Sequence, residues 1–198
     1  GLKLTDEMEN SIEEYILNNL DIEFQPVSGD LGRKIHVENP LRKYMDFLKS
    51  TLDIDLKGLK VAVDCGNGAT YKAAPQVYVI HNDPNGININ VNCGSTKPEE
   101  IQRLVLETGA DVGLSFDGDA DRLIASDENG SIVDGDHVLA ICGTCLKEKG
   151  RLKSNTIVGT VMTNMGLDMC LKENNIDIIK TKVGDRYVLE EMLKGGHS

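Results

Sequence analysis

One apolar run of this chain ends directly in three alternating aspartates and an arginine: VGLSFDGDADR, residues 112–122. Its first five residues have the length and apolar character of a buried strand. At about 5 Å and an effective dielectric constant of about 20, any two of the carboxylates of Asp117, Asp119 and Asp121 repel by about 3 kcal/mol. Mg²⁺, a hard cation that prefers oxygen ligands, removes this repulsion. The guanidinium of Arg122 suits phosphate. The run therefore predicts a magnesium site beside a phosphate, at a strand end.

Three other interpretations of the aspartate run are weighed against this one. A solvated acidic turn explains neither the apolar strand before the run nor Arg122 after it. A calcium EF-hand loop would place Asp117, Asp119, Asp121 and Glu128 at positions one, three, five and twelve. However, its position six needs glycine where this chain has Arg122, and its flanks must be helices. A phosphatase with an Asp-x-Asp nucleophile pair would use Asp117 and Asp119. The third aspartate and the arginine favour a metal with a phosphate.

The rest of the chain alternates between strand and helix patterns, which predicts an α/β fold with mixed, mainly parallel sheets flanked by helices. Expected strands are 61–64, 78–80, 112–116, 157–162 and 176–181, and Asn129-Gly130 signals a type I′ hairpin between 123–126 and 131–133. Expected helices are 6–20, 40–52, 69–77, 96–109, 137–146, 164–173 and 186–194. Thr96 and Glu99 have capping-box spacing. The pattern changes near residues 39 and 150, which divides the chain into 1–38, 39–150 and 151–198.

Composition excludes several classes of protein. The chain has 198 residues, of which 40% are hydrophobic, and this is enough for a packed core. A net charge of -11 argues against nucleic acid as a partner. No apolar run of about 18 residues predicts a membrane span, and no signal series opens the sequence, so a cytoplasmic location is expected. The five cysteines are expected to be reduced. Cys142 and Cys145 share an expected helix without a second pair to complete a zinc site.

Two glycine motifs have more than one interpretation. Gly66-Asn67-Gly68 follows an expected strand and reads better as a tight turn than as a phosphate-binding loop, because the third glycine of such a loop is missing. Gly184-Asp185-Arg186 follows the last expected strand, where ligands of parallel sheets bind. Asp185 is there either a helix N-cap or a ligand contact. No role is assigned to the four histidines.

Three motifs together resemble the α-D-phosphohexomutase superfamily, and within it the phosphoglucosamine mutase branch. The family's magnesium loop, Asp-Gly-Asp-x-Asp-Arg, matches residues 117–122. The sequence VDCGNGA, residues 63–69, resembles the opening of the family's second domain, and KVGDRYV, residues 182–188, resembles a substrate loop of the third. The similarity follows the family order through nearly the whole chain. It implies that 1–38 is the end of domain one, 39–150 is domain two and 151–198 begins domain three.

The resemblance implies phosphoryl transfer through a phosphoserine, with a hexosamine phosphate as substrate and a bisphosphate as intermediate. The expected reaction interconverts glucosamine 6-phosphate and glucosamine 1-phosphate for cell-wall precursors. The resemblance assigns Mg²⁺ to the three aspartates, a phosphate to the arginine and the sugar-phosphate path to a later loop; the residues are Asp117, Asp119, Asp121, Arg122, Gly184 and Asp185.

The sequence also departs from the family pattern. The family serine lies in a Ser-His-Asn-Pro loop, which this sequence lacks, so the phosphoserine is expected upstream of Gly1 and the chain alone is expected to be inactive. The connection between Ala74 and Tyr78 is shorter than in the family, and the sugar-reading Glu-x-Ser-Gly-His loop is not intact. The alternatives are a phosphomannomutase or phosphoglucomutase, or a metal-binding module without catalysis if no serine loop precedes Gly1. A homodimer is a further hypothesis.

Overall fold

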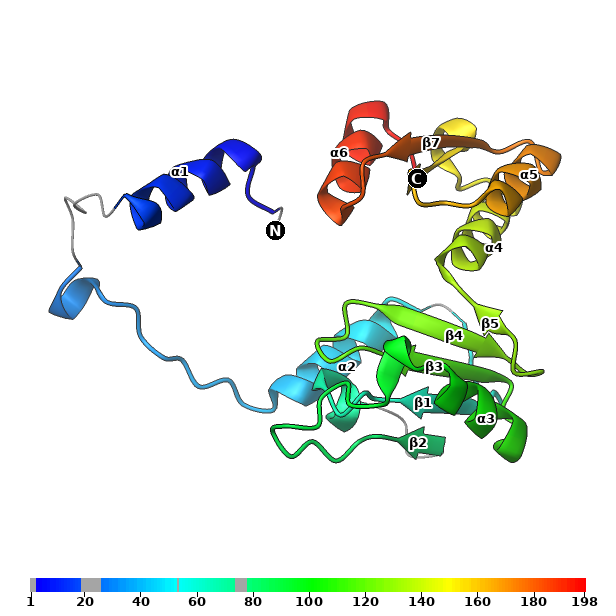
Figure 1. Ribbon diagram of the computed structural model, residues 1–198, viewed down its shortest axis with the longest axis horizontal. Helices are drawn as coiled ribbons and strands as arrows, with labels where there is room; N and C mark the ends of the chain where they lie inside the picture. Colours follow the sequence, from blue (N-terminus) through cyan, green and yellow to red (C-terminus); the bar gives the residue numbers. More distant parts are fainter. Residues whose placement is uncertain (1–2, 19–25, 53, 74–77) are drawn as a thin grey trace.

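The computed structural model describes residues 3–18, 26–52, 54–73 and 78–198. Its larger packing unit is a five-stranded sheet of order β2-β1-β3-β4-β5 (Figure 1). The strands are β1 (Val61–Asp64), β2 (Tyr78–Ile80), β3 (Val112–Phe116), β4 (Leu123–Asp127) and β5 (Ile132–Val133). β1 pairs in parallel with β2 and β3, whereas β4 pairs antiparallel with β3 and β5. The expected mixed α/β sheet is confirmed.

One face of this sheet packs against α3 (Glu99–Thr108). Ile101 and Val105 of the helix are fully buried against Ala62 and Ala110. Gly113 of β3 leaves them room, because a Cβ there would lie 2.6 Å from Val105 and 2.7 Å from Ile101. Gly109 ends α3 in the left-handed region, with φ 62°. Along β1 and β3 the side chains alternate between the two faces. Asp64 and Ser115, which pair in register, therefore share the α3 face.

The smaller packing unit is built on a parallel pair, β6 (Thr156–Thr160) and β7 (Asp177–Thr181). It contains α4 (Gly135–Glu148), α5 (Met165–Glu173) and α6 (Asp185–Gly195). Leu139 and Ala140 of α4 pack against its core. The buried side chains of this core are Ile157, Leu167, Leu171 and Ile176. α4 thus packs with the strands that follow it. The change of packing unit falls before α4 rather than at residue 150, where the sequence pattern places it.

Two helices precede the sheet. α1 (Asp6–Leu17) begins after Thr5, whose hydroxyl accepts a hydrogen bond from the backbone N–H of Met8 and so caps the helix. α2 (Pro40–Ser50) begins with proline at its first position, where the missing N–H has no helical partner to lose. The start of the chain contacts α6 through two ion pairs: Lys3 Nζ lies 2.7 Å from Asp185 Oδ1, and Arg186 Nη1 lies 2.6 Å from Asp6 Oδ1.

Several local predictions are wrong, each because a nearby contact replaces the expected one. The β4–β5 turn is not type I′: of Asn129 and Gly130, only Gly130 has positive φ, and Gly130 N–H donates to Asp127 O. This pattern is typical of a type I turn followed by a left-handed glycine. The Thr96 hydroxyl donates to Cys93 O instead of forming a capping box.

The helix expected over 69–77 is a single 3₁₀ turn, Ala69–Lys72, and residues 74–77 lie outside the described residues. The strand expected over 157–162 ends at Thr160. Beyond Thr160 the chain turns, because Val161 N–H donates to Thr181 O and Thr163 N–H donates to Thr160 O. The end of the helix expected over 6–20 also lies partly outside the described residues.

Candidate metal and phosphate site

The aspartate loop, residues 117–122, connects β3 to β4 and forms a tight turn at one end of the sheet. The two strands pair up to Phe116 and Leu123, which lie directly opposite each other. Across the mouth of the loop, Asp117 Oδ1 accepts a hydrogen bond from Arg122 N–H at 3.1 Å. Inside it, Ala120 N–H donates to Asp117 O, and Ala120 takes a left-handed conformation with φ 62°. The reversal of the chain at Ala120 brings the residues at alternate positions, 117, 119 and 121, close together.

The turn gathers the three predicted metal ligands. Asp117, Asp119 and Asp121 each offer a carboxylate oxygen, and these atoms lie within 4.8 Å of one another. Asp117 is half-buried, whereas Asp119 and Asp121 are exposed. The charge of Asp119 raises the pKa of Asp121 above its usual value, so the carboxylates repel in the metal-free chain. Several carboxylate oxygens facing one point form a donor set that fits Mg²⁺. The predicted ligands therefore come together as the sequence predicts.

Arg122 lies beside the carboxylates. Its side chain is 81% exposed, and its Nε lies 3.8 Å from Asp121 Oδ1. An exposed ion pair of this length contributes little to stability. The guanidinium can therefore turn toward an incoming phosphate without breaking a strong contact.

The structure excludes the EF-hand interpretation of the loop. The flanking elements are β3 and β4, and Glu128 lies in the β4–β5 turn, at the far end of β4 from the aspartates. An EF-hand needs helices on both sides and a bidentate glutamate closing the same loop.

The aspartate loop rests on glycines. Gly118 O accepts a hydrogen bond from Ala69 N–H at 2.8 Å. A Cβ on Gly68 would lie 2.2 Å from Gly118 O, so only glycine permits this approach. Gly66 and Gly94 meet Phe116 O in the same way, at 2.9 and 2.5 Å from an added Cβ. The prediction that Gly66-Asn67-Gly68 forms a turn is confirmed. The turn also supports the aspartate loop, and the sequence spacing did not reveal this contact.

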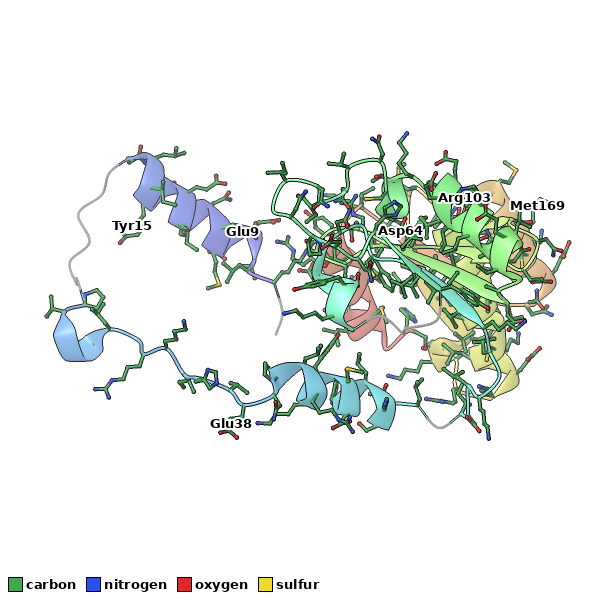
Figure 2. The ribbon with its side chains drawn as sticks, turned by 90° about the horizontal axis from the view of Figure 1, so that it is seen from below. Glu9, Tyr15, Glu38, Asp64, Arg103 and Met169 are labelled. Atoms are coloured by element: carbon green, nitrogen blue, oxygen red, sulfur yellow. The ribbon has the colours of Figure 1, made fainter. Side chains whose placement is uncertain are left out.

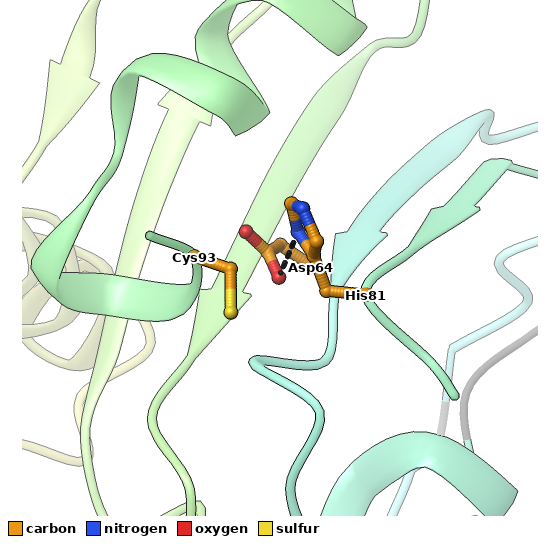
Figure 3. Close-up of side chains that lie close together, drawn as sticks. All are labelled: Asp64, His81 and Cys93. Atoms are coloured by element: carbon orange, nitrogen blue, oxygen red, sulfur yellow. Dashed lines mark hydrogen bonds and ion pairs between the residues drawn. The ribbon is translucent and has the colours of Figure 1, made fainter. Parts of the chain in front are cut away.

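A second group of ligand-type atoms lies on the α3 face of the sheet: Asp64, His81 and Cys93 (Figure 3). Asp64 is fully buried, among the densely packed side chains of the sheet unit (Figure 2). Its Oδ1 accepts hydrogen bonds from Gly66 N–H at 2.9 Å and lies 3.0 Å from His81 Nδ1, and its Oδ2 accepts from Gly94 N–H at 2.9 Å. These bonds compensate the buried carboxylate without a metal. Sequence reasoning assigned none of these three residues; the signal for Asp64 and His81 is a position at or just after a strand end, and Cys93, which precedes a 3₁₀ turn, has no such signal.

The loop at Gly184 and Asp185 lies in the smaller packing unit, at the start of α6. Gly184 has φ 136° and is itself the N-cap, so the prediction of Asp185 as N-cap is wrong. Asp185 instead pairs with Lys3, and this hydrogen bond lowers the pKa of its carboxyl. Both residues follow β7, at the C-terminal end of a parallel strand, as expected.

Family models match most of the chain. Residues 42–130 match "Phosphoglucomutase/phosphomannomutase, alpha/beta/alpha domain II", and residues 134–198 match domain III of the same family. The chain belongs to the phosphoglucomutase/phosphomannomutase family. The resemblance expected from the aspartate loop is confirmed at this level, and the two matched ranges meet just before α4, where the packing unit changes.

Curated relatives give a finer comparison. The chain is 57% identical over 205 residues to a phosphoglucosamine mutase of Alkaliphilus oremlandii and 56% identical over 205 residues to that of Acetivibrio thermocellus. Both alignments cover 100% of this chain and 46% of the relative. The chain therefore spans about half the length of the curated relatives it matches.

Solved structures share the fold. A phosphoglucomutase/phosphomannomutase family protein from Burkholderia thailandensis has a TM-score of 0.75 at 20% identity, covering 98% of this chain and 43% of that one. The phosphoglucomutase parafusin from Paramecium has a TM-score of 0.60 at 17% identity, covering 79% of this chain and 32% of its own. Within the described ranges, none of the helices has both the length and the apolar character needed to cross a bilayer.

Proposed function

We propose that this chain is the central part of a phosphoglucosamine mutase, which interconverts glucosamine 6-phosphate and glucosamine 1-phosphate. One observation carries the proposal: three carboxylates that converge beside an arginine at a strand end, in a chain 57% identical to a phosphoglucosamine mutase. We infer a boundary between its two domains near Asp134, in place of the boundary expected near residue 150, because α4 packs with the core of the smaller unit. A cytoplasmic location, a role in peptidoglycan precursor synthesis and a homodimer belong to the same proposal.

The aspartate loop supplies the phosphoryl-transfer half of the site. Asp117, Asp119 and Asp121 would hold Mg²⁺, and the bound ion would neutralise charge on a transferring phosphoryl group. Arg122, exposed at the loop, would orient a phosphate through its planar guanidinium. The nucleophile is a phosphoserine contributed by a part of the protein outside this chain. It would pass its phosphoryl group to the free hydroxyl of the hexosamine phosphate and regain the other phosphoryl group from the bisphosphate.

The loop at Gly184 and Asp185 would line the path of the sugar phosphate. Its support is its position beyond the C-terminal end of β7, where ligands of parallel sheets bind. Asp185 is 73% exposed on its side chain and shares an ion pair with Lys3, which a hydroxyl-bearing sugar can displace at little cost.

Turnover on three substrates tests the proposal. The protein expressed from the complete gene is assayed on glucosamine, glucose and mannose phosphates with a bisphosphate primer and Mg²⁺. We expect the highest kcat/KM on glucosamine phosphate. Equal or higher values on glucose or mannose phosphate would assign the protein to the phosphoglucomutase or phosphomannomutase activities of the same family. Absence of turnover on all three would leave a metal-binding module.

A substitution tests the metal ligands separately. Asp119→Asn should weaken Mg²⁺ binding at least tenfold, because it removes one charged ligand from an exposed site, and should lower the mutase rate without unfolding the chain. Asp83→Asn is the matched control, because Asp83 is also exposed but lies in another loop. An unchanged Mg²⁺ Kd for Asp119→Asn, measured by calorimetry, would reject the site.

A further inference from the structure

Asp64 holds two separate loops with one buried carboxylate. It is the last residue of β1 and has no exposed surface. One oxygen accepts from Gly66 N–H, in the turn that follows β1, and the other accepts from Gly94 N–H, thirty residues away in sequence. Both bonds measure 2.9 Å and are buried. The carboxylate therefore fixes the position of Gly66 relative to Gly94.

Gly66 and Gly94 both lie against the entrance of the aspartate loop. An added Cβ would lie 2.9 Å from Phe116 O at Gly66 and 2.5 Å at Gly94, so this carbonyl lies close against both backbones. Both glycines have positive φ, 55° and 74°. Phe116 immediately precedes Asp117. A shift of either glycine is thus passed to the backbone that carries the first carboxylate of the loop.

His81 orients the Asp64 carboxylate. Its Nδ1 lies 3.0 Å from Asp64 Oδ1, and Figure 3 shows the ring beside the carboxylate; His81 directly follows β2, the strand paired with β1. His81 O accepts a hydrogen bond from Asn67 N–H at 2.7 Å, inside the turn that begins with Gly66. The histidine therefore contacts both the carboxylate and one of the loops that the carboxylate holds. Its side chain is 29% exposed, so it can be replaced without opening the core.

We propose that Asp64, oriented by His81, is a positioning residue for the aspartate loop: through Gly66 and Gly94 it sets the backbone that aims Asp117, Asp119 and Asp121 at one cation. This inference rests on the proposed function of the loop as a magnesium site. In this proposal Asp64 contacts neither the substrate nor the metal. Its contribution is to keep the three oxygens converged before the ion arrives.

The test compares two carboxylates of like chemistry. Asp127 also accepts two backbone N–H bonds, from Asn129 and Ser131, but in the β4–β5 turn away from the aspartate loop. Asp64→Asn and Asp127→Asn are prepared in the full chain, and the Kd for Mn²⁺, a probe for the Mg²⁺ site, is measured by calorimetry well below each melting temperature. We expect about a tenfold weaker Kd for Asp64→Asn and less than a twofold change for Asp127→Asn. A Kd within twofold of wild type in Asp64→Asn overturns the proposal.

His81→Asn separates positioning from a simple charge effect. Asparagine tolerates the left-handed backbone that His81 adopts, with φ 51°, so the fold should be retained. Asp64→Asn removes a carboxylate, which by itself weakens cation binding through space. His81→Asn removes no negative charge, so a purely electrostatic effect would not weaken cation binding in this variant. Positioning instead predicts about threefold weaker Mn²⁺ binding. A tighter or unchanged Kd in His81→Asn rejects the proposal, and this variant decides the question if Asp64→Asn does not fold.

The proposed function can fail independently. If Asp119→Asn leaves the Mn²⁺ Kd unchanged, the loop is not the metal site, and the positioning role falls with it. If Asp119→Asn abolishes binding while Asp64→Asn binds normally, the metal site stands and only the positioning role is wrong.

Discussion

Gly68→Ala should separate the aspartate loop from its support with a single methyl group. Gly68 has φ -113° and ψ -155°, an extended conformation that alanine adopts without strain, so the substitution acts only through space. The new Cβ would lie 2.2 Å from Gly118 O, 2.6 Å from Gly118 Cα and 2.7 Å from Gly118 C. All three are backbone atoms, so no side chain can rotate away. The loop itself must move.

The size of the effect follows from these distances. Carbon atoms need roughly 3.5 Å from non-bonded neighbours, so the loop must move by about 1 Å. The hydrogen bond from Ala69 N–H to Gly118 O, 2.8 Å long, lies at the same contact, and its loss costs about 1 kcal/mol. With the steric strain, we expect a total loss of about 2 kcal/mol, or a melting temperature lower by roughly 4–8 °C. Since Gly118 separates Asp117 from Asp119, the metal Kd should rise at least tenfold.

Calorimetric titration with Mn²⁺ and thermal unfolding followed by circular dichroism measure both effects. Gly135→Ala is the control, because a Cβ at Gly135 meets nothing within 4 Å and its φ is not positive. The control should keep the Kd and slightly stabilise α4, since alanine is the better helix former. If Gly68→Ala binds Mn²⁺ as tightly as wild type and melts within about 2 °C of it, the loop does not depend on this contact and the reasoning is refuted.

Two further predictions follow from the charges and the cores. In Asp121→Asn, the metal-free chain should melt higher than wild type at pH 7, and the rise in melting temperature caused by Mg²⁺ should shrink. The folded pKa of Asp121 is raised above 3.8, so its ionised form opposes folding at neutral pH, and this penalty disappears as pH falls through the raised pKa; the difference between variant and wild type should therefore vanish on acidification. Thermal scans at several pH values measure this, and a difference that grows toward low pH would contradict it. Leu171→Ala removes a buried side chain from the core of the smaller unit and should lower the free energy of unfolding by about 2–5 kcal/mol, measured in urea. The Mn²⁺ Kd should not change, because the aspartate loop is supported within the larger unit. Weaker Mn²⁺ binding by folded Leu171→Ala would show that the two units are coupled.

The aspartate site could be predicted from sequence because its chemistry is local. Asp117, Asp119 and Asp121 stand at alternate positions directly after an apolar strand, so any tight turn there brings their oxygens together. The structure adds the left-handed conformation of Ala120 and two hydrogen bonds to Asp117, all within the same six residues. Strand and helix patterns are also local, and they predicted most of the described elements.

The support of the site could not be predicted, because it joins distant segments. Asp64 and Gly94 are thirty residues apart, and nothing in either short motif indicates the other. The glycines at 66 and 68 looked like an ordinary turn until the carbonyls of Phe116 and Gly118 were seen against them. The two helix-cap predictions were wrong for a similar reason. The hydroxyl of Thr96 donates to Cys93 O, and the carboxylate of Asp185 pairs with Lys3.

The aspartate loop and the loop at Gly184 and Asp185 belong to different packing units, which affects how such a protein can change. The contacts described for the aspartate loop come from residues 64–122, within the larger packing unit. Gly184 and Asp185 belong to the smaller unit, behind a different hydrophobic core. If this loop lines the path of the sugar phosphate, as proposed, substitutions in it can alter which hexose phosphate is accepted without moving the carboxylates, since the two loops share no backbone contact among those described above. Substitutions at Gly66, Gly68 or Gly94 are expected to move the carboxylates, because the close approach of another backbone there leaves no space for a side chain.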